Sequence, residues 1–320
     1  MHTLPALTAT AELPAANLVR LAAWAEVARE ALAPNTLRGY HTDTGRFRAW
    51  CELQDRRPLP ATPETVVAFL QAEVEAKPYK VGTLRRRAAS IGAMHRAADL
   101  PNPCEAALVR LELKGLARRL GTGQRQAAPL TERDLHRIRA RMGDTVRDLR
   151  DQALLLVGRD LLARASELVA LRVEDVTAAD NGGALVALRR LKTDTEARPY
   201  LIGPETRAAL EAWLRRAGID GGLLFRSVNK AGKASDRGLS TRDVGRVLKG
   251  RAMQAQLTTA AGMSAHSMRT GMACDLVARG TEMPKVMTAG GWSTPSMVAR
   301  YTAGLAAQRG AIADYYGLGG

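Results

Sequence analysis

The chain has 320 residues, of which 46% are hydrophobic, and its 47 lysines and arginines outnumber its 32 aspartates and glutamates. A chain of this length suits two domains, and its hydrophobic content excludes global disorder. The net charge of +15 indicates a polyanionic partner such as nucleic acid. Only eight of the basic residues are lysines. Arginine binds phosphate and guanine with two hydrogen bonds, although a GC-rich genome also enriches it.

The cysteines and the N-terminal residues indicate in which cellular compartment the protein is expected. Cys51, Cys104 and Cys274 are scattered, so neither a disulfide framework nor a zinc site is expected. The N-terminus lacks the basic start of a signal peptide. No uncharged run approaches the ~20 apolar residues that cross a bilayer. We therefore expect a soluble, cytoplasmic protein with no membrane partner.

The first part of the chain is predicted to be a mobile arm, residues 1–13, followed by a helical domain, residues 14–120. Asn35 is a plausible cap for the second helix, and Thr62 with Pro63 is a typical start for the third. No strand signal is present there. The helical periodicity predicts helices over residues 15–31, 35–52, 63–75, 81–99 and 105–120.

Two of these helices carry basic faces that are candidates for contact with DNA. Helices fit the major groove, where arginine reads guanine and any cation meets phosphate. The alternative is an ordinary solvated face, and the pattern does not distinguish base-reading residues from phosphate-binding ones. The candidates are Arg38, Tyr40, Arg46 and Arg48 on the second helix, and Lys80, Arg85, Arg86, Arg87 and Ser90 around the start of the fourth.

Residues 121–129 are short, polar and contain glycine, so we place a linker there, followed by a second domain over residues 130–320. Thr131 with Asp134 resembles a capping box. An apolar helix is expected over residues 144–162. Ser166 is a good N-cap for a short helix beginning at Glu167, and Arg164 is then expected on the preceding loop.

A small antiparallel sheet follows in the second domain. The turn at Asn181-Gly182-Gly183 separates strands expected over residues 173–176 and 184–188, and a second turn precedes a strand at 198–202. Lys192 is expected near that hairpin tip. A helix over residues 204–217, a polar loop over 229–238 and a helix beginning near Ser240 come next. Further helices are expected up to the C-terminus. The fold class is therefore mainly α, with a helical N-terminal domain and an α+β C-terminal domain.

One stretch near the C-terminus carries residues suited to chemistry on an anion. His266 and Arg269 are three residues apart, so on a helix they share a face and can converge on one anion. Tyr301 offers a phenol that can attack such an anion if the fold brings it close. Taken alone, the His-x-x-Arg spacing is commonplace, and a lone histidine is more often a core residue.

Five short motifs occur together, in one order and at characteristic spacings: Leu-Leu-Ala-Arg164-Ala-Ser-Glu167-Leu, Lys192-Thr, His266-Ser-Met-Arg269, Ala-Gly-Gly-Trp292 and Val-Ala-Arg-Tyr301. Through them the chain resembles the tyrosine site-specific recombinase (phage integrase) family. The resemblance extends over Ser240-Thr241-Arg242 and, more loosely, the helical first half. Trp292 stands where many members have histidine, so a second imidazole is not available for proton transfer.

The resemblance implies a role for each motif residue. Arg164 and Arg269 would each bind a non-bridging phosphate oxygen, and Glu167 would orient the Arg and His side chains. His266 would donate to the phosphate or assist removal of the proton of Tyr301, which would form a 3′-phosphotyrosine. The remaining implied roles are a general acid for the 5′-oxygen at Lys192, a phosphate donor at Trp292 and a guanine reader, as in some members of the family, at Arg242.

Each of these residues also has a plainer interpretation. Arg164 can be a surface cation, Glu167 only a helix cap, Lys192 a solvated hairpin lysine and Trp292 a core residue. Arg242 can contact phosphate or cap its helix. Tyr315 and Tyr316 compete with Tyr301, although only Tyr301 has the family's spacing from Gly-Gly-Trp.

The resemblance further implies a C-shaped clamp on double-stranded DNA with inverted-repeat arms. Four copies, monomeric off DNA, would exchange strands between two sites through a Holliday junction, with no metal or other cofactor. Accessory proteins are left open. The tail over residues 305–318 would dock on a neighbouring copy or on its own domain. The alternatives are a type IB topoisomerase-like or telomere-resolving enzyme, and a non-catalytic DNA-binding regulator.

Overall fold

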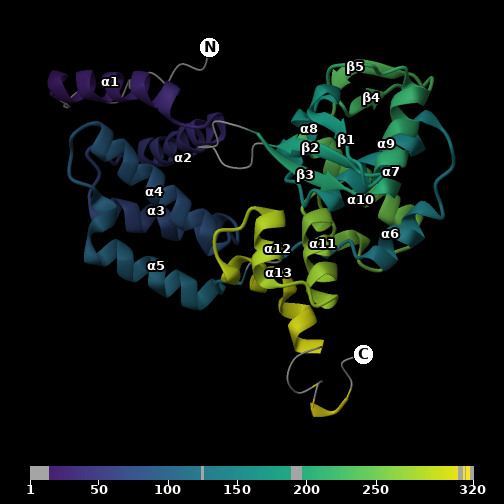
Figure 1. Ribbon diagram of the computed structural model, residues 1–320. Helices are drawn as coiled ribbons and strands as arrows, with labels where there is room; N and C mark the ends of the chain where they lie inside the picture. The colour runs from purple at the N-terminus through teal and green to yellow at the C-terminus, as the bar shows by residue number, and fades with distance from the viewer. Residues whose placement is uncertain (1–13, 124–125, 189–196, 309–312, 314, 318–320) are drawn as a thin grey trace. The chain divides into compact units, whose positions relative to one another are not determined.

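The computed structural model describes residues 14–123, 126–188, 197–308, 313 and 315–317. The chain divides into two compact units, Met1–Gln124 and Arg125–Gly320 (Figure 1). The boundary between the units falls within residues 121–129, the segment expected to be a linker. No helix among the described residues is long and apolar enough to span a membrane.

The first unit is helical throughout its described residues. Its core is formed by fully buried side chains that include Phe47, Phe69, Ile91 and Leu116, and the rings of Phe47 and Phe69 meet edge to face at 5.1 Å. Helix α2 packs on α4, and α3 packs on α5. Its helices are α1 (Ala15–Ala31), α2 (Pro34–Leu53), α3 (Pro63–Ala76), α4 (Val81–Ala97) and α5 (Ala107–Leu120), with a 3₁₀ turn at Pro103–Glu105.

The two predicted caps in this unit have different outcomes. The Thr62 hydroxyl accepts a hydrogen bond from the Thr65 amide at 3.3 Å, which confirms the start of α3. The prediction that Asn35 caps α2 is wrong, because the helix already begins at Pro34. Proline suits a first helical position, since it has no N–H to leave unpaired. The Asn35 side chain instead accepts from Arg38 at 2.7 Å.

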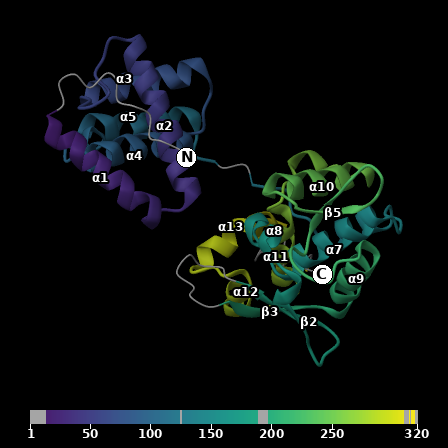
Figure 2. The same ribbon diagram turned by 90° about the horizontal axis from the view of Figure 1, so that it is seen from above.

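The second unit contains helices on both sides of short strands. In Figure 2, α10 and β5 lie on one side of α7, and β2 and β3 lie on the other. The helices are α6 (Glu132–Arg139), α7 (Val146–Asp160), α8 (Ala165–Ala170), α9 (Pro204–Ala217), α10 (Thr241–Gln254), α11 (Ser267–Ala278), α12 (Met283–Gly290) and α13 (Pro295–Gln308). The strands are β1 (Val176–Ala178), β2 (Ala184–Leu188), β3 (Arg198–Ile202), β4 (Arg226–Val228) and β5 (Ala234–Gly238), and 3₁₀ turns lie at Val173–Asp175 and Ala260–Gly262.

The three-stranded sheet has the order β1-β2-β3 and is antiparallel. Ala184 pairs with Ile202 and Leu188 with Arg198, which confirms the predicted strands at 184–188 and 198–202. The strand expected at residues 173–176 is largely wrong, because Val173–Asp175 is a 3₁₀ turn and β1 begins at Val176. In this turn the Asp175 carboxylate accepts from the Arg172 amide at 2.8 Å, and this local bond holds the backbone out of the ladder.

The polar loop expected at residues 229–238 is in fact half of a second hairpin. Strands β4 and β5 pair antiparallel, with Val228 opposite Ala234. The Asn229 side chain accepts from the Lys233 amide at 3.0 Å, and Gly232 supplies the positive φ that the turn requires. Strand β5 lacks alternating hydrophobic residues, so its pairing partner rather than its own pattern makes it a strand.

Helix α7 forms the centre of the second unit, as its apolar sequence predicts. Leu154 and Leu155 are fully buried, and α7 packs along α9, where Trp213 is also fully buried. The Trp213 indole N–H donates to the carbonyl of Leu224 at 2.9 Å, so its polar atom is satisfied. Truncating Leu154 to alanine would remove about 2–5 kcal/mol of stability. The C-terminal end of α7 is thereby held rigidly where it leads into α8.

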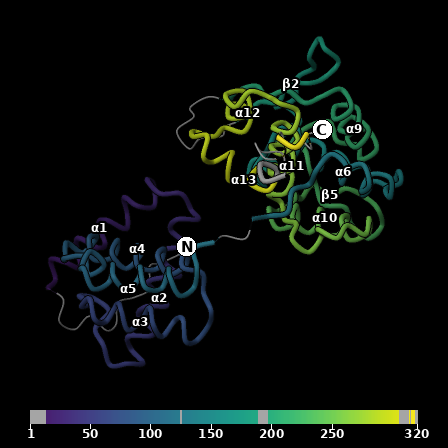
Figure 3. Tube along the Cα trace, turned by 90° about the horizontal axis from the view of Figure 1, so that it is seen from below, coloured from purple at the N-terminus to yellow at the C-terminus, as the bar shows by residue number. Residues whose placement is uncertain are grey.

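The last three helices form a separate apolar cluster. Helices α11, α12 and α13 pack against one another, as the Cα trace shows (Figure 3). Val286 and Val298 are fully buried in it, together with Leu162 from the turn after α7. Two of the aromatic side chains of this cluster are Trp292 and Tyr301. The cluster therefore brings the end of α7 and the C-terminal helices, which are far apart in sequence, to one place.

Candidate active site

The first part of the site lies at the start of α8. Leu162 has a left-handed backbone with φ of 45°, which turns the chain sharply after α7, and Arg164 is the residue that caps α8. The Glu167 carboxylate accepts from the Arg164 amide at 2.8 Å and from its guanidinium at 2.6 Å. The prediction that Ser166 caps this helix is wrong, because Arg164 is the N-cap residue. Glu167, the third residue of the helix, accepts from the Arg164 amide with its carboxylate. Glu167 therefore both caps the helix and orients Arg164.

The second part comes from α11. His266 caps this helix and Arg269 lies in its first turn, so the predicted helical spacing of the pair is present. Arg269 is 1% exposed. Its guanidinium donates to the carbonyl of Leu162 at 2.6 Å and stacks over the Trp292 ring at 4.3 Å. A buried guanidinium held on two sides is pre-organised, and it keeps its positive charge at any working pH.

His266 connects the arginines to the tyrosine. Its ring centroid lies 5.2 Å from that of Tyr301. Burial, and then the positive charges of Arg269 and Arg164, lowers the pKa of His266 below its usual value. The imidazole is therefore neutral near pH 7 and able to accept a proton. The charges of Arg164 and Arg269, which come from different helices, thus both act on one imidazole.

The Gly290-Gly291-Trp292 motif has a steric explanation. Gly291 has φ of 63° and ends α12 in the left-handed region. A Cβ at Gly290 would lie 2.1 Å from the Trp292 ring, so only glycine permits the indole to fold back over the helix end. Trp292 thereby contacts both Arg269 and Tyr301, and the ring centroid of Tyr301 lies 5.6 Å from that of the indole.

The Trp292 indole N–H is a buried donor that no described residue accepts from. A buried polar group without a partner costs roughly 1–3 kcal/mol, so such a group is more typical of a binding site than of a core. An indole nitrogen can only donate, so its partner would be an acceptor such as a phosphate oxygen.

Tyr301 lies on α13, and two further contacts hold this part of the helix. The Cys274 thiol donates to the Tyr301 carbonyl at 3.4 Å. Burial, followed by the charge of Asp275, raises the pKa of that thiol, so it stays protonated. The Gln126 side chain donates to the Arg300 carbonyl at 2.5 Å. Sequence reasoning did not identify Cys274 or Gln126, because a backbone carbonyl acceptor leaves no signal in the sequence.

The arrangement thus brings together two guanidiniums, a neutral imidazole, an unpartnered indole N–H and a phenol. Donors and positive charge stabilise the negative charge that develops on an attacked phosphate. The structure brings together six of the predicted site residues: Arg164, Glu167, His266, Arg269, Trp292 and Tyr301. The seventh, Lys192, lies outside the described residues. Among those described, no group of three or more metal-binding side chains is arranged around a common point.

The basic residues predicted to contact DNA in the first unit have mixed surroundings. Arg87 is buried, pairs with Glu73 and stacks on the Tyr79 ring at 4.1 Å. Desolvation, with the charge of Arg46 second, lowers the pKa of Arg87. The Ser90 hydroxyl is also buried and donates to Asp43 at 2.9 Å. Arg87 and Ser90 therefore lie inside the helical unit rather than on its surface.

The remaining candidates reach the surface to different degrees. Arg46 pairs with Glu73 at 2.7 Å, Arg86 pairs with Asp43, and Arg48 lies 3.5 Å from Glu52. The Tyr40 ring packs 6.1 Å from that of Trp24. The exposed candidates in this unit are Arg38, Arg46, Lys80, Arg85 and Arg86, and in the second unit Arg242 is exposed in the first turn of α10.

Comparison with known proteins agrees with this fold and site. Residues 129–308 match the model of the phage integrase family. The chain is 27% identical over 303 residues to the recombinase Cre of Escherichia phage P1, covering 89% of this chain and 88% of Cre. It is 30% identical over 286 residues to the integrase/recombinase XerD homolog of Selenomonas ruminantium, covering 84% of this chain and 81% of that protein.

Solved structures share the same architecture. The Tn1549 transposon integrase in complex with circular intermediate DNA aligns with a TM-score of 0.63 at 19% identity, over 88% of this chain and 94% of that one. A λ integrase dimer bound to a core site aligns with a TM-score of 0.62 at 15% identity, over 90% and 95% of the two chains. The fold is thus that of DNA strand-transferring tyrosine recombinases. The chain belongs to the phage integrase family and is a tyrosine recombinase, as its motifs predict.

Proposed function

We propose that this protein recombines DNA at specific sites by cutting and rejoining strands through a covalent bond between Tyr301 and a 3′-phosphate. The observation that carries the proposal is the packing of the Tyr301 ring beside both a neutral His266 and Trp292, with the Arg269 guanidinium over that indole. A phenol beside a base, a buried donor and a fixed cation has what attack on a phosphodiester requires.

In the cleavage step, the Tyr301 phenol oxygen forms a bond to phosphorus, and the bond from phosphorus to the 5′-oxygen breaks. The neutral His266 imidazole assists removal of the phenol proton. Arg164 and Arg269 hold the two non-bridging oxygens, and Trp292 donates to one of them. Lys192 delivers the proton that the 5′-oxygen takes up as it leaves.

The covalent phosphotyrosine keeps the energy of the broken bond, so a 5′-hydroxyl from another strand can reverse the step and reseal the backbone. Repeating the exchange on the second strand pair requires a Holliday junction and two sites. We propose that four copies of this chain hold these sites, each copy binding one inverted-repeat arm. The exposed Tyr315 and Tyr316 side chains belong to the tail that would dock on a neighbouring copy. Both units would bind the DNA, and the protein would act in the cytoplasm.

The test is to trap the covalent complex in cells and sequence the DNA that it carries. The wild-type chain is expected to recover one short DNA site attached through Tyr301. The Tyr301→Phe variant should bind the same duplex in vitro and form no adduct on a nicked substrate. Adduct formation by Tyr301→Phe would show that another residue is the nucleophile.

A matched control uses Tyr315→Phe, which removes an exposed phenol of the same chain. Tyr315→Phe is expected to cleave like the wild type. Relaxation of supercoiled DNA without any site preference or strand exchange would instead favour a topoisomerase. Binding without cleavage by the wild-type chain would favour a regulator.

A further inference from the structure

A pocket in the second unit lies outside the site described above. It has a volume of about 540 Å³ and lies between the start of α7, the β4–β5 hairpin and one side of α10. Eight of its fourteen lining residues are charged. The charged side chains of the lining are Arg147, Asp148, Arg150, Asp151, Arg237, Asp243, Arg246 and Arg251.

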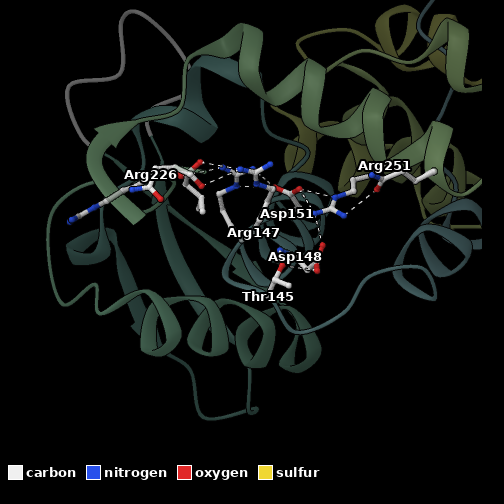
Figure 4. A network of polar contacts seen from close by, with 10 residues as sticks. Thr145, Arg147, Asp148, Asp151, Arg226 and Arg251 are labelled. Carbon is white, nitrogen blue, oxygen red and sulfur yellow. Dashed lines mark hydrogen bonds and ion pairs between the residues drawn. The ribbon is translucent and has the colours of Figure 1, made fainter. Parts of the chain in front are cut away.

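The inner wall of the pocket is a closed network of ion pairs. Arg251 pairs with Asp148 at 2.6 Å and with Asp151 at 2.7 Å, and Arg150 pairs with Asp151 at 2.5 Å. Figure 4 shows Arg251 and these aspartates joined in one chain of contacts, with Thr145 donating to Asp148 at 2.7 Å. The charges of these two arginines and two aspartates offset each other, so this inner wall is nearly neutral. We call these four residues the floor of the pocket.

The neighbours of Asp148 in this floor lower the pKa of its carboxyl group. Burial acts to raise its pKa, but the hydrogen bonds from Thr145 and Arg251, with the charge of Arg251, together lower it. Hydrogen bonds from Ser240, first from its side chain, lower the pKa of Asp243 as well. Both carboxylates are therefore committed as anions at neutral pH, and their charge does not vary over the working range.

The pocket mouth carries a surplus of positive charge. Arg147, Arg237 and Arg246 face only one further carboxylate of the lining, that of Asp243. Arg246 is 69% exposed and lies 3.3 Å from Asp243, so this pair contributes little. Arg237 forms no ion pair with any carboxylate in the part of the chain that the structure describes. Arg147 donates only long bonds of 3.4 and 3.3 Å to the carbonyls of Val228 and Asn229.

A neutral donor completes the lining. Ser227 lies in the pocket wall, and its hydroxyl is buried with no hydrogen-bond partner among the described residues. Arg147 and Arg237, which form no ion pair among the described residues, and the weakly paired Arg246 match the oxygens of one phosphate group, together with the unused Ser227 hydroxyl.

The position on α10 indicates where such a phosphate would come from. Arg246 is four residues after Arg242, so the two side chains project from the same face of the helix. If Arg242 enters a DNA groove, as the family resemblance implies, the strand beside that groove passes Arg246 at the mouth of the pocket. The base edges that a protein reads lie on the floor of a DNA groove, and backbone phosphates line the edge of the groove.

We propose that this pocket binds one or two backbone phosphates of the duplex arm beside α10, through Arg237, Arg246 and the adjacent Arg147. It is a phosphate clamp separate from the active site, and it sets how far α10 advances into the groove. The inference rests on the proposed function, because it needs a duplex on this face of α10. The site is specific to phosphate and not to base sequence.

The test compares the salt dependence of duplex binding by the full chain and by the double variant R237Q/R246Q. The logarithm of the binding constant falls with the logarithm of salt concentration by about 0.9 for each neutralised phosphate. The double variant is expected to lower that slope by about 0.9 to 1.8, on an arbitrary duplex and on the target duplex alike. The matched control is R215Q/R216Q, which removes two exposed arginines of α9, a helix outside the pocket lining.

The outcomes separate this inference from the proposed function. An unchanged slope in R237Q/R246Q, with normal binding by the wild type, overturns the phosphate clamp alone. An equal loss of slope in R215Q/R216Q also overturns it, because the effect would then be one of bulk charge. A wild-type chain that binds no duplex at all contradicts the proposed function. Stabilisation of the protein by inorganic phosphate over chloride at equal ionic strength, lost in R237Q/R246Q without any change of slope, would assign the pocket to a free anion instead.

Discussion

Substituting Gly290 by alanine tests whether the position of Trp292 controls the chemistry. The new Cβ would lie 2.1 Å from one ring atom of Trp292 and 2.2 Å from another. To reach even a 3.0 Å contact, the indole must move by about 0.9 Å, the difference from the 2.1 Å that the structure gives. Trp292 is 5% exposed and cannot simply rotate into solvent.

The displacement acts on the two groups that the indole contacts. Arg269 stacks at 4.3 Å on its ring and Tyr301 packs at 5.6 Å. A misplacement of ~1 Å at reacting groups lowers a rate by about 10²-fold. We therefore expect Gly290→Ala to reduce covalent adduct formation by about 10²-fold. Stability should fall by about 1–3 kcal/mol, because the new Cβ overpacks a buried site, and the gain of about 1 kcal/mol from alanine in a helix offsets only part of this.

The assay is single-turnover adduct formation on a nicked duplex that carries the recovered target site, with thermal unfolding measured in parallel. Gly115→Ala is the matched control, because it lies within helix α5 and a Cβ there has no atom within 4 Å. Gly115→Ala is expected to be slightly more stable and fully active. Wild-type adduct rates in Gly290→Ala would refute the reasoning that the indole must sit where only glycine permits it.

Three further predictions concern single groups. The adduct-forming rate at low DNA concentration should stay constant from pH 8 down to the lowered pKa of His266 and decline only below it. The reason is that burial, and then the charges of Arg269 and Arg164, favour the neutral ring. A decline already complete near pH 6.5 would contradict this. Glu167→Gln should slow cleavage about 10-fold by weakening the hold on Arg164, measured as adduct rate with the duplex affinity unchanged. The buried His95 ring accepts a hydrogen bond from the Ala61 amide, and burial lowers the pKa of His95. The stability that the neutral ring contributes should therefore be complete above pH 6.5 and be lost as pH falls below it. The free energy of unfolding, measured with urea, should change by at most about 1.4 kcal/mol per pH unit in the wild type, and His95→Gln should lack this change.

Local sequence determined most of the secondary structure. The periodicity and prolines predict α1, α3 and α9 within a residue of their observed bounds, and strands β2 and β3 are correct. These elements form from contacts between near neighbours in the chain. The misassigned segments are those in which a distant or competing partner decides, such as β5, which becomes a strand only by pairing with β4.

The chemical types at the active site are also readable from the sequence, because each motif holds a residue with one suitable chemistry. Arg164, His266 and Tyr301 could be named from their motifs and spacing. What spacing does not contain is their distance in space. Arg164 and Arg269 meet at one imidazole because the turn after α7 packs against α11.

Tertiary structure alone decided which polar groups are committed and which are free to act. Arg87 and Arg246 look alike as basic helix residues, yet Arg87 is buried against Glu73 whereas Arg246 lies at the mouth of a charged pocket. The Trp292 N–H has no acceptor among the described residues, in a ring position that only glycine at 290 permits. A sequence states which donors and charges exist, whereas burial and partnership depend on segments far apart in the chain.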